Sequence, residues 1–465
     1  MRTGAPMGSG AEVFALPVRQ AFLVCNPVAG VSALINGAAL KSLRQQLSGV
    51  ALPESVSASV AELAALLNQA APCSQRQDQA PLHPQFLGIL PTRACNIACR
   101  YCDFGAGAAS HRTMDLRMAR AAADWYAGFL QRSGQDLMEI HFFGGEPFIA
   151  RDVVETVVHR GRVLAARNNL TPHFEVSTNG VFEADYARFV GDYFDAVILS
   201  FDGFREVHDL HRPMDSRRGS FEEVRQSAML LAGSPAELCL RCCVTTANVD
   251  ALEEIADWFC REFRPAAVNF ETLSMNAKSQ AAGLSPPDPY VFARSYYQAR
   301  KVMQRHGIRS VYAAAQSMDG NCAGFCPVGR DTLIVSPDGR ISSCYLPQAA
   351  WRQAGLALDV GRISADGSVT VDADAILRLR RLAEDKPRCI NCFCRWSCGG
   401  GCHVSHTPPG SSLQYQDYCI QTRLISASML LDAMGEEQAA RVLLADRQAM
   451  EALALQRSDR IGVSR

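Results

Sequence analysis

The chain has 465 residues, of which 48% are hydrophobic and 20% are charged, and its formal net charge is -1. This length exceeds what one hydrophobic core usually organises, so we expect two or three domains with ordinary globular interiors. The balanced charge gives no general attraction to nucleic acid or to an anionic membrane surface, and no apolar run reaches the roughly 18 residues of a membrane span, so we expect no nucleic-acid and no membrane partner.

The N-terminal segment, residues 1–83, predicts a small α+β module. Residues 1–15 lack the basic start and the apolar block of a secretory signal, which favours a cytoplasmic protein. Two short apolar runs flank a Pro and Gly turn within residues 21–35, a pattern that is typical of a hairpin. Helical patterns follow the hairpin at residues 38–47 and 60–69.

Between residues 84 and 309 the pattern changes to strands that alternate with helices. Six apolar runs are expected to form strands, at residues 86–90, 138–143, 174–177, 196–200, 238–245 and 268–272. Helical patterns lie between them, at residues 116–130, 153–166, 221–231 and 251–263. Such alternation favours a parallel sheet with right-handed crossovers, so we predict an α/β fold built on a partial (β/α)6 TIM-like barrel. In such folds the functional loops follow the C-terminal ends of the strands.

The remaining sequence divides into two parts. Residues 310–423 show little helical periodicity and are rich in Cys, Gly and Pro, so we expect that metal binding orders this Cys-rich domain. Residues 424–465 predict one or two amphipathic helices. The chain has 18 cysteines, of which three lie within residues 95–102 and nine lie between Cys322 and Cys419. Because the cytoplasm keeps thiols reduced, metal thiolates explain this distribution better than disulfides do.

Three cysteines, Cys95, Cys99 and Cys102, follow directly after the first strand of the alternating region. Three thiolates leave one iron of a four-iron cluster without a protein ligand, and that iron can coordinate a substrate or a cofactor. One alternative is a zinc site completed by a histidine such as His111. Three reduced core cysteines are a further alternative, which the close spacing disfavours.

This spacing, CxxxCxxC with an aromatic residue before the third cysteine, resembles the signature of the radical S-adenosylmethionine (SAM) superfamily, and Tyr101 is the aromatic residue. The resemblance implies that Cys95, Cys99 and Cys102 are the catalytic ligands of one [4Fe-4S] cluster. It further implies that the reduced cluster cleaves SAM to methionine and a 5'-deoxyadenosyl radical. An electron donor such as a flavodoxin or a ferredoxin is implied as a partner.

Three later segments resemble the SAM-binding elements of this family, and each follows a predicted strand. Residues 144–147 match the element that contacts the amino group of SAM, and residues 177–180 and 200–203 match elements on its ribose and carboxylate side. His208 and Arg212 match an HxxxR element whose arginine can pair with the SAM carboxylate. The resemblance implies cofactor contacts at Tyr101, Gly144, Gly145, Glu146, Pro147, Ser177, Asn179, Ser200, Asp202 and Arg212.

The later cysteines resemble the seven-cysteine pattern of the SPASM domain, and Cys322 adds an eighth. Eight thiolates suit two fully ligated [4Fe-4S] clusters, which would bring the total to three clusters. The resemblance implies a first auxiliary cluster at Cys322, Cys326, Cys344 and Cys402 and a second at Cys389, Cys392, Cys398 and Cys419. Cys394 lies outside the pattern, and two zinc sites are the alternative for this domain.

Enzymes that combine these two domains typically modify peptides or proteins, so the resemblance implies a precursor peptide or protein as substrate, and we favour cross-linking of a ribosomally made peptide. Such enzymes often bind a leader peptide as an added strand on an N-terminal module, a role we expect for residues 1–83 beside the alternative of a packing extension. Oxidation of a sulfatase residue is an alternative, which is disfavoured because sulfatase maturases place an aspartate where this chain has Tyr345. Small-molecule radical chemistry and a non-catalytic iron-sulfur protein are the others.

Overall fold

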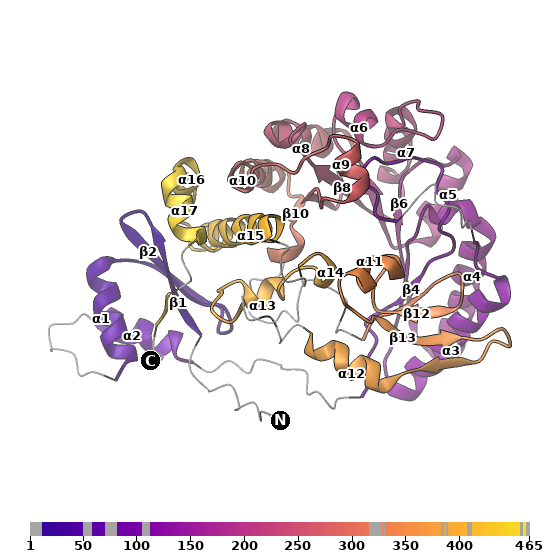
Figure 1. Cartoon of the computed structure of the whole chain (residues 1–465), viewed down its shortest axis with the longest axis horizontal. Coiled ribbons are helices and arrows are strands. Elements are labelled where there is room, and N and C mark those ends of the chain that lie inside the picture. Colours follow the sequence, from indigo (N-terminus) through magenta and orange to yellow (C-terminus); the bar gives the residue numbers. More distant parts are fainter. Residues whose placement is uncertain are drawn as a thin grey trace.

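Two sheets organise the chain. The computed structural model describes residues 12–49, 58–69, 81–104, 112–315, 328, 331–382, 386, 389–406, 412–455 and 459–461. Their strands form one sheet of four strands, in the order β15-β1-β2-β3, and one of eleven, in the order β10-β9-β8-β7-β6-β5-β4-β11-β12-β13-β14. Figure 1 shows the small sheet at one end of the molecule and the large sheet, curved and covered by helices, at the other. Cys322, Cys326 and His111 lie outside the described residues.

The six predicted strands form consecutive parallel pairs in the large sheet, which confirms the predicted α/β partial barrel. They are β4 (Leu87–Ile89), β5 (Leu137–Phe142), β6 (Thr171–Thr178), β7 (Ala196–Ser200), β8 (Glu237–Val244) and β9 (Ala267–Thr272). A further strand that the sequence pattern does not predict, β10 (Arg309–Val311), pairs in parallel with β9. All of these strands run in one direction, so the loops at their carboxyl ends meet on one side of the sheet.

Helices connect these strands and cover the outer face of the sheet (Figure 1). They are α3 (Leu116–Ser133), α4 (Arg151–Asn168), α5 (Ala184–Tyr193), α6 (Arg205–His211), α7 (Phe221–Ala232), α8 (Leu252–Glu262), α9 (Ala277–Ala281) and α10 (Pro289–Arg305). Short 3-10 helices lie at η1 (Pro147–Ala150), η2 (Val249–Ala251) and η3 (Ala313–Ala315). The sequence marks their ends: Asp115 caps α3 through the Arg117 amide, and Gly134 ends it in the left-handed conformation.

Alternation along β8 separates the core from the interior of the barrel. Leu238 and Leu240 are buried, whereas Arg241 and Cys243 are partly exposed on the opposite face of the strand. Because successive side chains of a strand point to opposite faces, the same pattern in neighbouring strands directs polar side chains into the barrel.

The N-terminal sheet joins both ends of the chain. The predicted hairpin is confirmed by β2 (Ala21–Asn26) and β3 (Val31–Asn36), which pair antiparallel and are followed by α1 (Gly37–Leu47) and α2 (Ala58–Leu67). The sequence pattern does not reveal β1 (Val13–Val18), which pairs with β2 on one side and with β15 (Asp459–Ile461) on the other.

The Cys-rich region continues the large sheet beyond β4. Its first strand, β11 (Leu333–Val335), pairs in parallel with β4, and the others follow antiparallel: β12 (Arg340–Ser342), β13 (Asp359–Ile363) and β14 (Val369–Val371). The helices are α11 (Gln348–Gln353), α12 (Ala373–Arg381), α13 (Arg395–Cys398) and α14 (His403–His406). Arg380 binds Asp331 through two hydrogen bonds, and both side chains are almost fully buried.

Three helices end the chain: α15 (Ser412–Ala433), α16 (Glu437–Ala445) and α17 (Arg447–Leu455). The sequence predicted one or two helices after residue 424; the structure has three, which β15 follows, and α15 begins earlier and includes Cys419. It packs against α10, where Asp432 accepts hydrogen bonds from Tyr297 and Arg300. Within the ranges given above, the helices are all too short or too polar to cross a bilayer.

Candidate active site

The loop that follows β4 carries three thiols, those of Cys95, Cys99 and Cys102. Backbone hydrogen bonds from Ala98 to Pro213 (2.7 Å) and from Arg100 to His211 (2.8 Å) hold this loop against the end of α6. The three thiols line one cavity of about 310 Å³ at the carboxyl ends of the parallel strands. Burial raises the pKa of Cys95 to about 11 and that of Cys99 to about 12, so a metal must displace these protons in order to bind.

Most of the side chains predicted for this site line the same cavity. Beside the three cysteines, these residues are Tyr101, Gly144, Gly145, Ser177, Asn179, Ser200, Asp202 and Arg212. They come from the ends of four strands and from α6, which shows that the structure brings together motifs that lie far apart in the sequence. Glu146 and Pro147, which were predicted with them, do not line the cavity.

The two glycines of the 144–147 segment allow a close backbone approach to the thiol loop. A Cβ atom on Gly145 would lie 2.0 Å from the carbonyl oxygen of Ala94, and one on Gly144 would lie 2.5 Å from that of Thr92. The amides of Gly145 and Glu146 donate to the same two carbonyls, at 3.1 and 2.8 Å. Glycine is therefore required here by contact as well as by the positive φ of Gly144.

Glu146 lies under the cavity and positions one of its walls. Its carboxylate is 1% exposed and accepts hydrogen bonds from the Asn179 amide (2.7 Å), the Thr178 hydroxyl (2.9 Å) and the Phe148 amide (3.2 Å). Burial raises the pKa of this carboxyl group to about 7. These contacts fix Asn179, whose side-chain nitrogen Nδ2 lies 3.5 Å from the sulfur of Cys95. Glu146 thus orders the residue that faces the thiol, and Pro147 begins η1 beside it.

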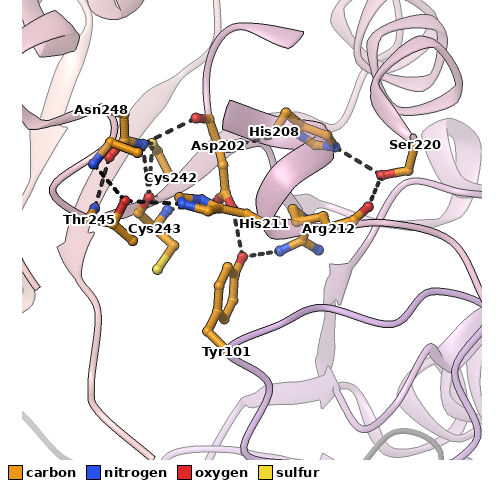
Figure 2. Close-up of polar contacts among 11 residues, drawn as sticks. Tyr101, Asp202, His208, His211, Arg212, Ser220, Cys242, Cys243, Thr245 and Asn248 are labelled. Atoms are coloured by element: carbon orange, nitrogen blue, oxygen red, sulfur yellow. Dashed lines mark hydrogen bonds and ion pairs between the residues drawn. The ribbon is translucent and has the colours of Figure 1, made fainter. Parts of the chain in front are cut away.

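Asp202 is the centre of a buried polar network behind the thiols (Figure 2). One of its oxygens accepts from the Tyr101 hydroxyl (2.8 Å) and lies 3.2 Å from Nδ1 of His211, and the other accepts from the Cys243 amide (2.9 Å). Burial alone would raise the pKa of Asp202, but the hydrogen bond with His211 and the charge of Arg212 lower it to about 2. Asp202 therefore remains an anion that holds Tyr101 in place.

Arg212 connects this network to the cavity. Its guanidinium donates to the Tyr101 hydroxyl at 2.5 Å, and its buried Nε has no hydrogen-bond partner among the described residues. Burial alone would lower its pKa, but the Cys99, Tyr101 and Asp202 side chains raise it, so the group stays charged. A buried N–H without a partner costs free energy unless a ligand supplies an acceptor. Arg212 therefore fits an anionic group in the cavity, such as the carboxylate of SAM.

His208 should make the stability of the protein depend on pH. Its Nδ1 accepts from the Asp202 amide (3.2 Å) and its Nε2 faces the Ser220 hydroxyl (3.1 Å), and burial lowers its pKa to about 3. An unfolded histidine binds a proton below a pKa of about 6.5, whereas native His208 stays neutral, so stability is highest above that pH and falls as the pH drops. We expect a loss of about 2 kcal/mol between pH 7 and pH 5 from this group.

Urea unfolding at pH 7, 6 and 5 measures this loss. The variant His208→Asn keeps an acceptor for the Asp202 amide but does not titrate in this range. Its stability should fall less steeply between pH 7 and pH 5 than that of the wild type. Equal slopes for the two proteins would contradict the assignment.

Several polar residues of this cavity were not predicted from the sequence. Arg241, Cys243 and Glu271 lie at the ends of β8 and β9 and line the cavity with the thiols. The alternating pattern of β8 could have revealed two of them. Every second residue of this strand is buried in the core, and Arg241 and Cys243 lie together on the other face. Cys243 lies in an apolar run that was predicted as a strand, and the structure places it on the cavity wall.

A second cavity, of about 400 Å³, contains further thiols. Cys389, Cys392, Cys398 and Cys419, the four residues predicted to hold the second auxiliary cluster, all line it, together with Cys394. Cys402 and Cys344 are not among the lining residues. Their predicted partners Cys322 and Cys326 lie outside the described ranges, so that group stays a prediction.

The arrangement of these thiols bears on the zinc alternatives. Zinc–sulfur bonds of about 2.3 Å bring the ligand sulfurs of one ion within about 4 Å of each other. Over the part of the chain that the structure describes, no three Cys, His, Asp or Glu side chains converge in that manner. The thiols instead surround spaces of about 310 and 400 Å³. Several thiols thus line each cavity, as the ligands of an iron-sulfur cluster would.

Comparisons with known proteins agree with this geometry. Residues 89–259 match the model of the radical SAM superfamily. The fold is similar to that of anSMEcpe with bound AdoMet and Cp18Cys peptide, at 19% identity and a TM-score of 0.60, over 76% of this chain and 99% of that chain. It is also similar to SuiB from Streptococcus suis, at 13% identity and a TM-score of 0.50, over 84% and 95% of the two chains. At these identities the structural likeness shows the fold, and the family match covers the thiol motif and four of the strands after it. The chain therefore contains a radical SAM domain over residues 89–259, and it is an enzyme of the kind that uses S-adenosylmethionine with a [4Fe-4S] cluster.

Proposed function

We propose that this enzyme is a radical SAM/SPASM maturase that modifies a side chain of a ribosomally made precursor peptide, by forming a cross-link. The observation that carries the proposal is the pair of thiol-lined cavities, one with three predicted ligands at the carboxyl ends of the barrel strands and one with four. When bound, the reduced cluster and SAM together supply a 5'-deoxyadenosyl radical that abstracts a hydrogen atom.

The residues of the first cavity have distinct tasks in this proposal. Cys95, Cys99 and Cys102 hold three irons and leave the fourth for SAM. Arg212, with its unpaired Nε, orients the SAM carboxylate, and Asp202 keeps Arg212 and Tyr101 fixed. Ser177, Asn179 and Ser200, from the ends of β6 and β7, surround the sugar, and the backbone of Gly144 and Gly145 receives the amino group.

The auxiliary clusters are the second part of the proposal. Cys389, Cys392, Cys398 and Cys419 hold one of them, and their common cavity supports this set. Cys322, Cys326, Cys344 and Cys402 hold the other. Fully ligated clusters near a substrate can accept the electron that a cross-linking oxidation releases, and a flavodoxin or ferredoxin supplies the electron that reduces the first cluster.

The N-terminal sheet supports a peptide as the substrate. One outer strand of this sheet is β15, and the other is β3, whose second edge has no strand partner among the described residues. An open edge offers backbone N–H and C=O groups to an added strand, which is a common mode of peptide recognition. Residues 1–83 would bind the leader peptide in this way. The solved anSMEcpe complex, which has this fold, also holds a peptide beside AdoMet.

Sulfatase-type protein oxidation remains the second candidate, because the fold of this chain is similar to that of anSMEcpe over 99% of the anSMEcpe chain. The position after Cys344 disfavours it. Tyr345 replaces the aspartate expected there, and its ring lies against Phe143 (4.8 Å between centroids) and Gly88. The neighbouring Leu346 lines the first cavity. No carboxylate stands at this point to act as a base.

Anaerobic reconstitution tests the proposal. The purified chain, supplied with iron, sulfide, dithionite and SAM, should contain about twelve irons, as three clusters require, and should release 5'-deoxyadenosine. Co-expression with short open reading frames from the neighbourhood of its gene should yield a peptide of altered mass, and the loss of two hydrogens would identify a cross-link. About four irons per chain would contradict the auxiliary clusters, and an unchanged peptide with a modified sulfatase would favour the second candidate.

A further inference from the structure

Arg423 lies one helical turn after Cys419 on α15, so both side chains face the second cavity. Its guanidinium lies near the thiols of Cys392, Cys419 and Cys394. The Nε atom is buried and has no hydrogen-bond partner among the described residues. A cation with a free donor thus points into a space that is lined by five thiols.

The same arginine is anchored from outside the cavity. Its Nη1 donates to the carbonyl oxygen of Ala454 at 2.6 Å, near the C-terminal end of α17, where a cation also complements the helix dipole. A purely structural role would end with this contact. Such a role does not account for the Nε atom, which has no partner among the described residues, or for the place of Arg423 on the wall of the thiol-lined cavity.

The other cations at this cavity are engaged differently. Lys386 donates to the carbonyl oxygens of Gly400 (2.8 Å) and Gly401 (3.3 Å), and Arg395 stacks on Trp396 at 5.2 Å. No acidic side chain is among the residues that line the cavity. Arg423 is thus the cation beside Cys392 and Cys419, whereas Lys386 lies nearer to Cys398.

We propose that Arg423 sets the reduction potential of the auxiliary cluster at Cys389, Cys392, Cys398 and Cys419, by donating a hydrogen bond to a cluster sulfur and by placing a fixed positive charge beside it. The inference rests on the proposed second auxiliary cluster. Reduction adds one electron, and hence one negative charge, to a cluster, so a neighbouring cation stabilises the reduced form and raises the potential. Arg423 thereby favours this cluster as an electron acceptor from the substrate.

The test is a redox titration of the reconstituted full-length enzyme with dithionite, followed by EPR spectroscopy. Arg423→Gln should shift the reduction equilibrium of one cluster toward the oxidised form by at least tenfold, which for a one-electron couple is 59 mV. The SAM-binding cluster should keep its potential. Arg423→Lys retains the charge and should stay within threefold of the wild type. Arg447→Gln is the matched control, because Arg447 starts α17 but pairs with Asp288 and Glu451 at the surface.

Three outcomes would overturn the inference. An unchanged potential in Arg423→Gln would show that the charge does not act on the cluster, and an equal shift in Arg423→Lys would show that packing is responsible. If the glutamine variant does not retain its iron, the lysine variant becomes the test. A tenfold shift of the cluster's reduction equilibrium in Arg423→Lys would then reject the role of the charge. Failure of the proposed function is distinct, because a wild-type protein with only about four irons per chain would lack this cluster altogether.

Discussion

Replacing Cys95, Cys99 and Cys102 together with alanine abolishes the formation of 5'-deoxyadenosine from SAM. Without these thiols the first cavity has no ligands for the cluster that reduces SAM. The rate should fall to that of dithionite and SAM without protein. Iron should fall by about four atoms per chain, while the remaining iron stays at the later cysteines. Liquid chromatography of the nucleoside and a colorimetric iron assay measure the two effects.

Independence of the cavities is the reason for the partial loss of iron. The thiols near β4 and those near α13 line separate cavities with no residue in common. Cys260→Ala is the matched control, because Cys260 is 2% exposed on α8 and lines neither cavity. It should keep its iron and its activity. A triple variant that loses all of its iron would contradict the independence of the sites.

Asp202→Ala should destabilise the fold by about 3–5 kcal/mol, because breaking a buried ion pair leaves the partner charge without compensation. Arg212 and Asp202 are at most 5% exposed, and Tyr101 bridges them. The Cys243 amide and His211 would lose acceptors as well. The affinity for SAM should fall together with stability, since Tyr101 and Arg212 both line the cavity. Urea unfolding and calorimetric titration with SAM measure these two losses.

Two further variants separate charge from hydrogen bonding at this position. Asp202→Asn retains an acceptor for the Cys243 amide but lacks the negative charge, so its stability should lie between those of the wild type and Asp202→Ala. Asp124→Ala removes a surface carboxylate paired with Arg160 and should change stability by less than about 1 kcal/mol. Similar losses for Asp202→Ala and Asp124→Ala would show that the buried network does not stabilise the fold.

Sequence patterns determined the parts of this protein that depend on local spacing. The alternation of apolar runs and helical patterns predicted the six parallel strands, because each element depends on the periodicity of its own residues. The thiol motif predicted the first cavity, since three cysteines within eight residues of one loop must lie together. The hairpin at residues 21–36 was predicted for the same reason, from two runs around one turn.

Only the tertiary structure decided which distant residues meet. Glu146 turned out to support Asn179 and not to line the cavity, because its carboxylate is buried beneath the turn that follows β6. The pairing of β15 with β1 joins residues more than 400 positions apart. Arg423 reaches the thiols because α15 begins before the predicted helix and carries Cys419 one turn away. Such contacts form when separate elements pack together, and burial, charge and hydrogen bonding decide which of them form. The spacing of residues along the sequence does not contain this information.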